Sequence, residues 1–330
     1  MAAITGQLQT FNAPNYLGEL FHLTPTETPF LSMIGGLNGG EGIADNQWSW
    51  QGDDNVNAAQ DTKVEGADAT FAGRSRAMFS NVVQIHQEGV EVSYTKQATV
   101  NKLADAALSG ITQSALLSIQ GAQPVQNEMS RQLMLKIMKI ARDVEYSFIN
   151  GVFAQPVTNA TARATRGILA AITGNGVAGT NVDATGATNI RTQFNTLLRG
   201  MVGDTSRGAP LRQAVIFAGA LVRQQLTNAY GYAPESRNVG GLNIQQIETD
   251  FATMGIVFDR FMPAQTLAVI ELSVCKPKFL AIPGKGLFFT EPLAKTGSAE
   301  KMQIYGEIGL EYGPPDWHGR IFNIPTSINL

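Results

Sequence analysis

The clearest hydrophobic pattern in the chain has helical spacing and extends from Pro124 to Phe153. Apolar residues recur there at steps of three and four, which predicts one long amphipathic helix. Its inward positions are expected to be Met129, Leu133, Ile137, Ile140, Ala141, Val144 and Phe148. Pro124 suits the first turn of a helix, and Gly151 suits its end. We expect this helix to be the spine of the fold, although a core helix of an ordinary enzyme would show the same pattern.

Residues 46–96 have the alternating pattern of strands and predict a long two-stranded excursion. The outgoing strand, Gln47–Trp50, places both tryptophans on one face. On the returning strand the apolar positions change parity around Gly89, which predicts a β-bulge there. The residues between the strands are polar and acidic, so this hairpin cannot bury itself and needs a partner surface. We expect its charge contacts with a neighbouring subunit to include Asp53, Asp54, Arg74 and Arg76.

Residues 1–45 predict an N-terminal arm without a core of its own. The segment Thr24–Leu31 reads TPTETPFL, and each proline disfavours helix at the residue before it, so we expect an extended strap. Thr28 and Phe30 of this strap are candidate contacts with a neighbouring subunit. Glu128 and Arg131 are three residues apart on the spine, where they should form an ion pair, and they are candidates for the same interface.

The remainder of the chain alternates between helical and strand patterns. Residues 97–186 are expected to form a peripheral domain that contains the spine helix 124–153, preceded by a helix broken near Gly110 and Gly121. After the spine, Thr165–Leu169 predicts a turn entering a strand. Residues 187–298 predict an α/β axial domain, with helices at Ile190–Met201 and Ala220–Tyr230 and strands at Ala214–Phe217, Gln245–Thr249, Gly255–Phe258 and Thr266–Leu272.

The C-terminal residues 299–330 are expected to close the peripheral domain with a β-hairpin. Met302, Ile304, Ile308, Leu310 and Tyr312 alternate with polar residues and predict a long strand. Residues 313–316 form a turn rich in glycine and proline, after which Arg320–Ile324 would pair back on that strand. The predicted fold class is therefore α+β.

Composition narrows the possible functions. Only 15% of the 330 residues are charged, against an average of about a quarter, while 44% are hydrophobic. So few charged residues suggest a low-charge surface, which fits a protein whose exterior is covered by copies of itself. A protein with a merely neutral, polar surface would have the same composition. The net charge is −3 and the basic residues are scattered, so the chain lacks the clustered positive charge of a nucleic-acid-binding protein. We expect neither a signal peptide nor a membrane-spanning segment.

The sequence offers little for catalysis. The three histidines, His22, His86 and His318, stand in separate segments without the close companions of a helical metal site. His86 is expected at the surface of a strand, and the single cysteine, Cys275, is expected to be a buried apolar residue. Neither a nucleophile elbow nor a phosphate-binding loop is recognisable. We therefore expect no catalytic, cofactor-binding or metal-binding residues and no enzyme activity.

The order of these parts, together with three short motifs, resembles a known family. The motifs are TPTETPFL at Thr24–Leu31, KIARDVE at Lys139–Glu145 and TRGI at Thr165–Ile168. They resemble the major capsid proteins of tailed bacteriophages with the Hong Kong ninety-seven-like capsid fold, and most closely a sub-family whose arm carries a TPxxTPFL strap. The resemblance covers nearly the whole chain. No motif for the lysine–asparagine cross-link of some relatives is found.

The resemblance implies a structural function. Many copies, as hexamers and pentamers, would tile an icosahedral shell that encloses a double-stranded DNA genome without sequence-specific binding. The expected partners are the chain itself, a scaffolding protein, a portal and a cementing protein. The protein would be made and assembled in the bacterial host cytoplasm and would remain in the virion, with no membrane and no cofactor. The alternatives are the shell protein of an encapsulin-type nanocompartment, an extracellular β-rich binding module and, last, a hydrolase.

Overall fold

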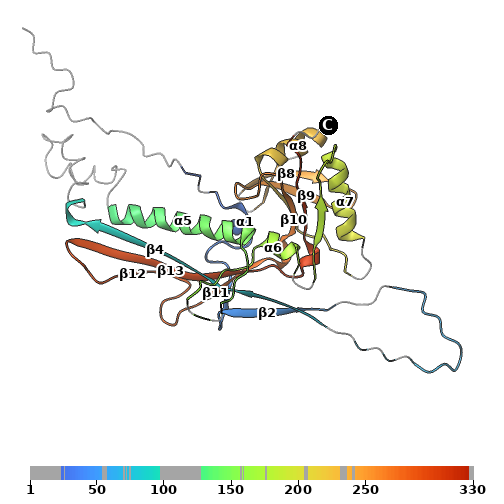
Figure 1. The fold of residues 1–330 in the computed structure, drawn as a ribbon, viewed down its shortest axis with the longest axis horizontal. Helices are drawn as coiled ribbons and strands as arrows, with labels where there is room; N and C mark the ends of the chain where they lie inside the picture. The colour runs from blue at the N-terminus through green and yellow to red at the C-terminus, as the bar shows by residue number, and fades with distance from the viewer. Residues whose placement is uncertain are drawn as a thin grey trace, which may run out of the picture.

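The computed structural model describes most of the chain and arranges it around one long helix and two main sheets (Figure 1). The described residues are 24–25, 27–53, 58–69, 71, 73, 76–96, 128–156, 158, 160–174, 177–203, 207–230, 236–239 and 242–326. Predictions about residues 1–23, the broken helix in 97–123 and the first spine residues 124–127 lie outside them. The α+β class is confirmed.

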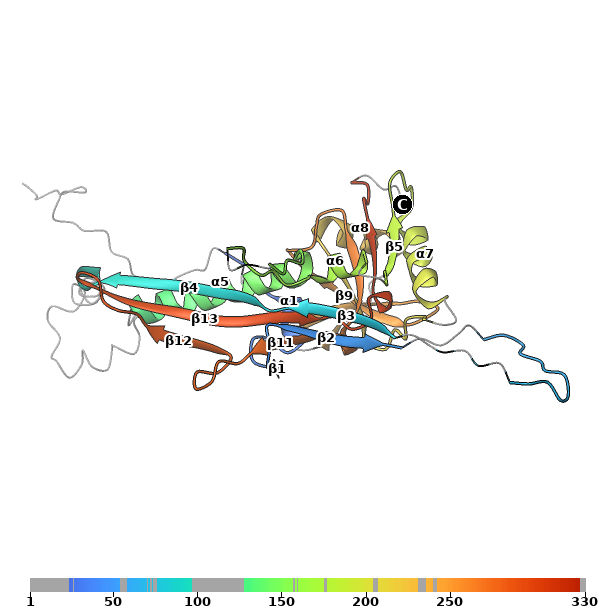
Figure 2. The same ribbon diagram turned by 60° about the horizontal axis from the view of Figure 1, so that its bottom comes forward.

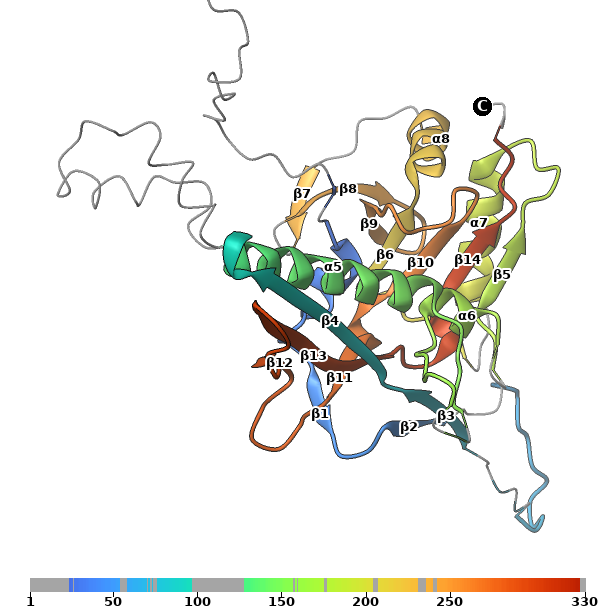
Figure 3. The ribbon, with the colours of Figure 1, turned by 60° about the vertical axis from the view of Figure 1, so that its left-hand side comes forward.

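The spine helix is α5, Glu128–Asn150, and it ends where Gly151 was predicted to end it. Figure 3 shows it crossing the molecule with one sheet on either side. Ile140, Val144 and Phe148 are buried, as the pattern predicted, but Ile137 is 42% exposed and its assignment to the core was wrong. The reason is that α1 (Pro29–Met33) and α6 (Ile168–Ile172) reach α5 near Glu145 and Ser147, beyond Ile137, whereas β4 (Gln84–Ser93) meets the helix at Lys136 and Lys139.

The first sheet is built on one long strand, β13, Ala299–Glu311. β4 (Gln84–Ser93) pairs with one edge of β13, while β11 (Lys276–Leu280) and β12 (Phe288–Pro292) pair in turn with the other. β1 (Glu41–Ile43) adds in parallel to β11. Figure 2 shows β4 and β13 side by side along almost their whole length.

The predicted bulge at Gly89 is absent from this sheet. The register between β4 and β13 is unbroken from Ser93↔Ala299 to Gln84↔Ile308. The change in parity occurs instead at Val83, between β3 (Ala77–Val82) and β4. As a result His86 faces inward and is buried, contrary to the prediction that it lies at the surface, and Ile85 faces outward.

A two-stranded ribbon forms the root of the predicted excursion. β2 (Gln47–Gly52) pairs with β3, and its tryptophans lie on one face as predicted, with ring centroids 6.4 Å apart. The returning chain therefore has two parts, since β3 pairs with β2 whereas β4 joins the five-stranded sheet.

The second sheet has seven strands in the order β5-β14-β10-β6-β9-β8-β7. Their bounds are β5 Thr180–Asp183, β6 Ala214–Ala218, β7 Ser236–Val239, β8 Leu242–Glu248, β9 Thr253–Phe258, β10 Leu267–Glu271 and β14 Gly319–Phe322. The predicted helices are confirmed as α7, Ile190–Val202, and α8, Ala220–Tyr230. The segment expected to enter a strand forms the short helix α6, Ile168–Ile172.

The predicted C-terminal hairpin is wrong. β14 pairs with β10 and β5 in the second sheet and not with β13, because the one-turn helix η3 (Pro315–Trp317) carries the chain from one sheet to the other. In addition, β11 and β12 lie in the first sheet although their residues fall within the predicted axial unit. The sheets therefore cross the predicted segment boundaries.

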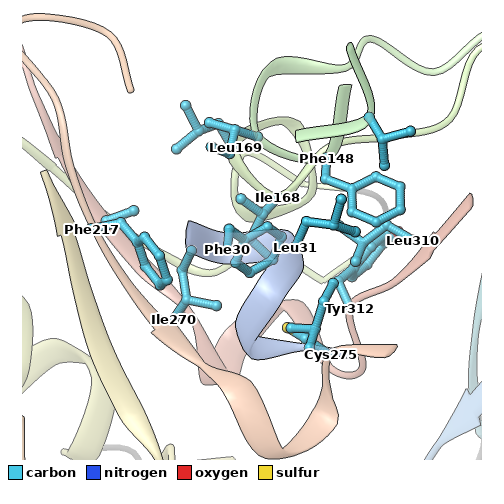
Figure 4. Packing of buried hydrophobic residues seen from close by; sticks show 14 of the residues in the cluster. Phe30, Leu31, Phe148, Ile168, Leu169, Phe217, Ile270, Cys275, Leu310 and Tyr312 are labelled. Atoms are coloured by element: carbon cyan, nitrogen blue, oxygen red, sulfur yellow. The ribbon is translucent and has the colours of Figure 1, made fainter. Parts of the chain in front are cut away.

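Two hydrophobic cores meet across the second sheet. Val215 and Phe217 of β6 face the first core, which also contains α1, α5, α6 and β13, while Ile216 of the same strand faces the second core under α7 and α8. Figure 4 shows Phe30 and Leu31 lying between Phe217 on one side and the residues of α5 and β13 on the other.

Candidate assembly surfaces

The most exposed part of the described chain is the loop between β2 and β3. Figures 1 and 2 show its described portion extending away from the body of the molecule. Two apolar side chains on this loop are almost entirely in solvent, with Phe71 95% and Val64 82% exposed. Lys63 and Asp61 form a local ion pair of 2.7 Å. Both side chains would leave water only if another molecule covered the loop.

The root of this loop, in contrast, is tightly held. Trp50 donates its indole N–H to the carbonyl of Gly313 at 3.0 Å, and its ring packs edge-on against Tyr312 with centroids 4.9 Å apart. Trp48 lies against the backbone of Gly309 on β13. The loop thus projects from a rigid base, which fixes the direction in which it leaves the subunit.

Two of the charged residues predicted to make contacts, Asp53 and Arg76, lie at this root. Asp53 is exposed directly after β2. Arg76 precedes β3 and donates to Gln51 Oε1 at 3.2 Å. Asp54 and Arg74 lie outside the described residues. Their contacts with a neighbouring subunit stay a prediction.

The arm does not form the extended strap predicted for Thr24–Leu31 throughout. Pro29 begins a short helix, α1 (Pro29–Met33), because a proline at the first helical position lacks only an N–H that would be unpaired anyway. The carbonyl of Thr28 accepts hydrogen bonds from the backbone and side chain of Ser32, at 3.0 and 2.7 Å. Phe30 is fully buried and packs edge-on against Phe217 at 5.4 Å. This part of the arm therefore docks on its own subunit.

At the other end of α5, the predicted pair of Glu128 and Arg131 is confirmed. Arg131 donates from Nη2 to Glu128 Oε1 at 2.6 Å and from Nε to Oε2 at 2.9 Å. These bonds lower the pKa of Glu128 to about 2, against the opposing effect of its burial. Lys136 and Lys139 of the same helix pair with Glu88, which ties α5 to β4.

One polar side chain that the sequence did not single out joins three segments. Asn81 is fully buried; its amide group donates to the carbonyls of Arg166 and Leu310, at 3.1 and 2.6 Å. Its Oδ1 accepts from the backbone of Arg166 at 2.8 Å and of Val82 at 2.9 Å. The TRGI motif therefore serves as an anchor between β3 and β13, and a glycine at 167 is required because a side chain there would collide with the backbone of Gly151.

His86, His318 and Cys275, the described residues considered for chemistry, are buried in the fold. His318 is fully buried, and its Nδ1 accepts from the backbone of Glu271 at 3.1 Å while Nε2 donates to the carbonyl of Tyr312 at 2.6 Å. Burial lowers the pKa of both His318 and His86 to about 4. Cys275 is buried, as predicted, which raises the pKa of its thiol. Within the described part of the chain, histidine, cysteine and carboxylate side chains do not gather in threes as metal ligands, and no helix there is long and apolar enough to cross a membrane.

Comparison with known proteins agrees with this architecture. A family model described as SU10 major capsid protein matches residues 3–325. The capsid of the cyanophage A-1(L) is similar in structure, with a TM-score of 0.60 at 15% identity, covering 94% of this chain and 97% of the other. The capsid of a native GTA particle gives 0.55 at 10% identity, covering 96% of each chain. The holo encapsulin complex of Synechococcus elongatus gives 0.54 at 12% identity, covering 96% and 93%. The curated proteins contain no match.

Proposed function

Because the chain belongs to the SU10 major capsid protein family, it is a major capsid protein, and we propose that its copies enclose a double-stranded DNA phage genome in an icosahedral shell built of pentamers and hexamers. Its fold is Hong Kong ninety-seven-like. We place it in the group whose arm carries a TPxxTPFL strap, on the evidence of Thr24–Leu31. Its role is structural, and the DNA is held by enclosure without sequence-specific binding.

The observation that carries this proposal is the loop between β2 and β3. Ordering such a loop costs about 1–2 kcal/mol of conformational entropy per residue, and its described residues bury little against their own subunit. Phe71 and Val64 would remain in water in an isolated chain. We propose that the loop lies over a neighbouring subunit, with Asp53, Asp54, Arg74 and Arg76 as charge contacts at its root. Each exposed pair contributes only about 0.2–1 kcal/mol, but a closed shell repeats it at every interface.

We propose a separate role for each successive segment of the chain. The arm, residues 1–45, and the predicted excursion, 46–96, connect subunits, although α1, β1 and β4 within them pack on their own subunit. Residues 97–186 form a peripheral domain around the spine and 187–298 an axial domain, except that β5 joins the second sheet and that β11 and β12 join the first. Residues 299–330 belong to both, since β13 completes the first sheet and β14 the second. Thr28, Glu128 and Arg131 remain proposed interface residues; Phe30 contributes by fastening the arm to its own core.

Assembly would take place in the host cytoplasm and involve further proteins. We propose a scaffolding protein, a portal and a cementing protein as partners, and the virion as the final location. The test is expression of the chain alone and together with candidate scaffolding proteins, followed by analytical ultracentrifugation and negative-stain microscopy. Capsomers or closed shells are expected. A chain that remained an inert monomer with every scaffold would contradict the proposal.

A second candidate function is the shell of an encapsulin-type compartment, because the structure of an encapsulin is also similar to this chain. The contents of purified particles separate the two functions. Nuclease-protected genomic DNA is expected for a virion, whereas a packaged protein with no DNA would indicate a compartment.

A further inference from the structure

A buried pair of carboxyl groups lies where three separate parts of the chain meet. Glu145 comes from the C-terminal half of α5, and Asp259 follows directly after β9. Both residues are fully buried. The third part is α1, which lies over Glu145 through its first two backbone amides.

The hydrogen bonds at this junction leave one place for a proton. Glu145 Oε1 accepts from the amide of Phe30 at 2.7 Å, and Oε2 accepts from the amide of Leu31 at 2.6 Å. Asp259 Oδ1 accepts from the amide of Phe261 at 2.8 Å. Its buried Oδ2 has no hydrogen-bond partner among the described residues, and the carboxyl group of Glu145 is close enough to influence its pKa. Two ionised carboxylates have no hydrogen to share, so a proton on one of them would supply the missing donor.

Packing around the pair joins α5 to the segment that follows β9. Asn150 donates its side-chain amide to the carbonyl of Phe261 at 2.8 Å. Tyr146 packs edge-on against the ring of Phe261 at 6.3 Å, and the guanidinium of Arg142 lies over the same ring at 5.8 Å. The carboxyl pair therefore lies beside a contact that α5 makes with Phe261 through a hydrogen bond, an aromatic pair and a cation.

We propose that Glu145 and Asp259 share a single proton and that this proton clasps α1 and the segment after β9 against the spine helix. Removing it would place two negative charges side by side in a dry site, where their repulsion is weakly screened. The junction would then open, and the arm would lose its anchor on the subunit. The clasp belongs to the folded subunit and does not depend on the proposed shell.

The surrounding charges do not replace the proton. On α5, Arg142 faces the ring of Phe261, and Asp143 is engaged with Lys139 at 3.0 Å. Arg260, next to Asp259, pairs with Glu27 of the arm at 3.3 Å on the exposed side. α1 and β6 carry no titratable side chain.

The direction of the pH effect follows from these surroundings. Burial raises the pKa of both carboxyl groups, and the neighbouring charge of Asp259 raises that of Glu145 further, against the two amide hydrogen bonds. A pKa above its unfolded value means that the contribution to stability is present at low pH. It is lost as the pH rises through the pKa of the folded pair.

The test is hydrogen exchange at the amides of Phe30 and Leu31 in the full-length chain over a series of acidic to alkaline pH values. In the wild type, the protection of both amides relative to an unfolded peptide should fall by up to about tenfold per pH unit as the pH rises towards the pKa of the folded pair, and should level off above it. Asp259→Asn supplies a permanent donor to Glu145 and should abolish this fall. Asp143→Asn, two residues from Glu145 on the same helix, should retain it.

Infrared spectroscopy provides a second measurement that does not require a variant to fold. A protonated carboxyl band is expected in the wild type at neutral pH, and it should disappear at the pH at which the protection of α1 stops falling. A wild type without that band at neutral pH, or with protection that is constant across the series, would overturn the proposal. So would an Asp259→Asn variant that folds and still shows the full fall.

Discussion

Gly309 of β13 lies directly beneath the indole ring of Trp48, so that a methyl group added to Gly309 would overlap the ring. The same methyl group would approach the carbonyl of Val82 to 2.8 Å. This contact fixes the root of the β2–β3 loop on the first sheet. The absence of a side chain at one strand position thus determines where the loop begins.

We predict that Gly309→Ala destabilises the subunit by about 1–3 kcal/mol, because neither the indole ring nor the backbone of β3 can move aside without disturbing the packing around Tyr312. Chemical denaturation followed by tryptophan fluorescence would measure the change. Gly89→Ala is the matched control, since it lies on the partner strand β4 with open space around its Cα. It should change stability by less than about 0.5 kcal/mol. Equal effects of the two substitutions would contradict the role assigned to Gly309.

For the loop itself, replacing residues 53–73 by a short glycine–serine linker should leave a folded subunit with unchanged thermal unfolding that forms no closed shells. Phe71→Ser should also fold normally, because the side chain is 95% exposed, and should reduce the yield of shells. Phe71→Tyr keeps the aromatic ring and should restore most of the yield. Electron microscopy and sedimentation would measure assembly. Regular shells from the linker variant would contradict the proposal that the loop lies over a neighbouring subunit.

The register of α5 can be tested with two isoleucines one turn apart. Ile140→Asp should prevent folding, because the side chain is 1% exposed and an unpaired buried charge costs several kcal/mol. Ile137→Asp should fold, since that side chain is 42% exposed. Circular dichroism and soluble yield would distinguish them. A folded Ile140→Asp variant would show that the helix is rotated relative to the register described above.

Acid should destabilise the subunit through its buried histidines. His86 and His318 have a pKa of about 4 when folded and about 6.5 when unfolded, so the unfolded chain takes up protons first. Their contribution is complete above pH 6.5 and is lost as the pH falls towards 4, by about 1.4 kcal/mol per pH unit for each histidine. The stability contributed by Glu41 and Glu128, whose folded pKa is about 2, is present above about pH 4.5 and is lost only as the pH falls below that value.

Urea denaturation between pH 7 and 5 would measure this dependence. His86→Gln should reduce the slope by about half at little cost at pH 7, because His86 Nε2 has no hydrogen-bond partner in the described part of the chain. His318→Gln should also reduce the slope but destabilise the chain at pH 7 by about 1–3 kcal/mol, because a hydrogen bond on each ring nitrogen is disturbed. A slope that neither substitution changes would assign the acid sensitivity to other groups.

The sequence predicted the features that depend on neighbouring residues. The spacing of apolar residues was sufficient for α5, α7, α8, β6 and β13, because each buries one face or both along its own length. Partners distant in the chain were harder to predict. The pairing of β14 with β10 depends on a one-turn helix that redirects the chain, and the inward position of His86 depends on a change of parity at Val83.

Polar contacts between segments that are distant in the chain leave no recognisable pattern in the neighbouring sequence. Asn81 and Arg166 are 85 residues apart, and Glu145 reaches amides 114 and 115 residues away. A lone asparagine in a strand and a glutamate on a helix are ordinary at the level of sequence. Their roles emerge only when folding brings together backbone groups that would otherwise be buried without partners.

β6 contributes alternate side chains to the two hydrophobic cores, Phe217 to one and Ile216 to the other. A shift of this strand by one residue would exchange the two sets at once and misplace side chains in both cores. The packing of both hydrophobic cores therefore favours the same register of β6. This property suits a protein that assembles from many identical copies, because a β6 strand in a shifted register would pack correctly in neither core.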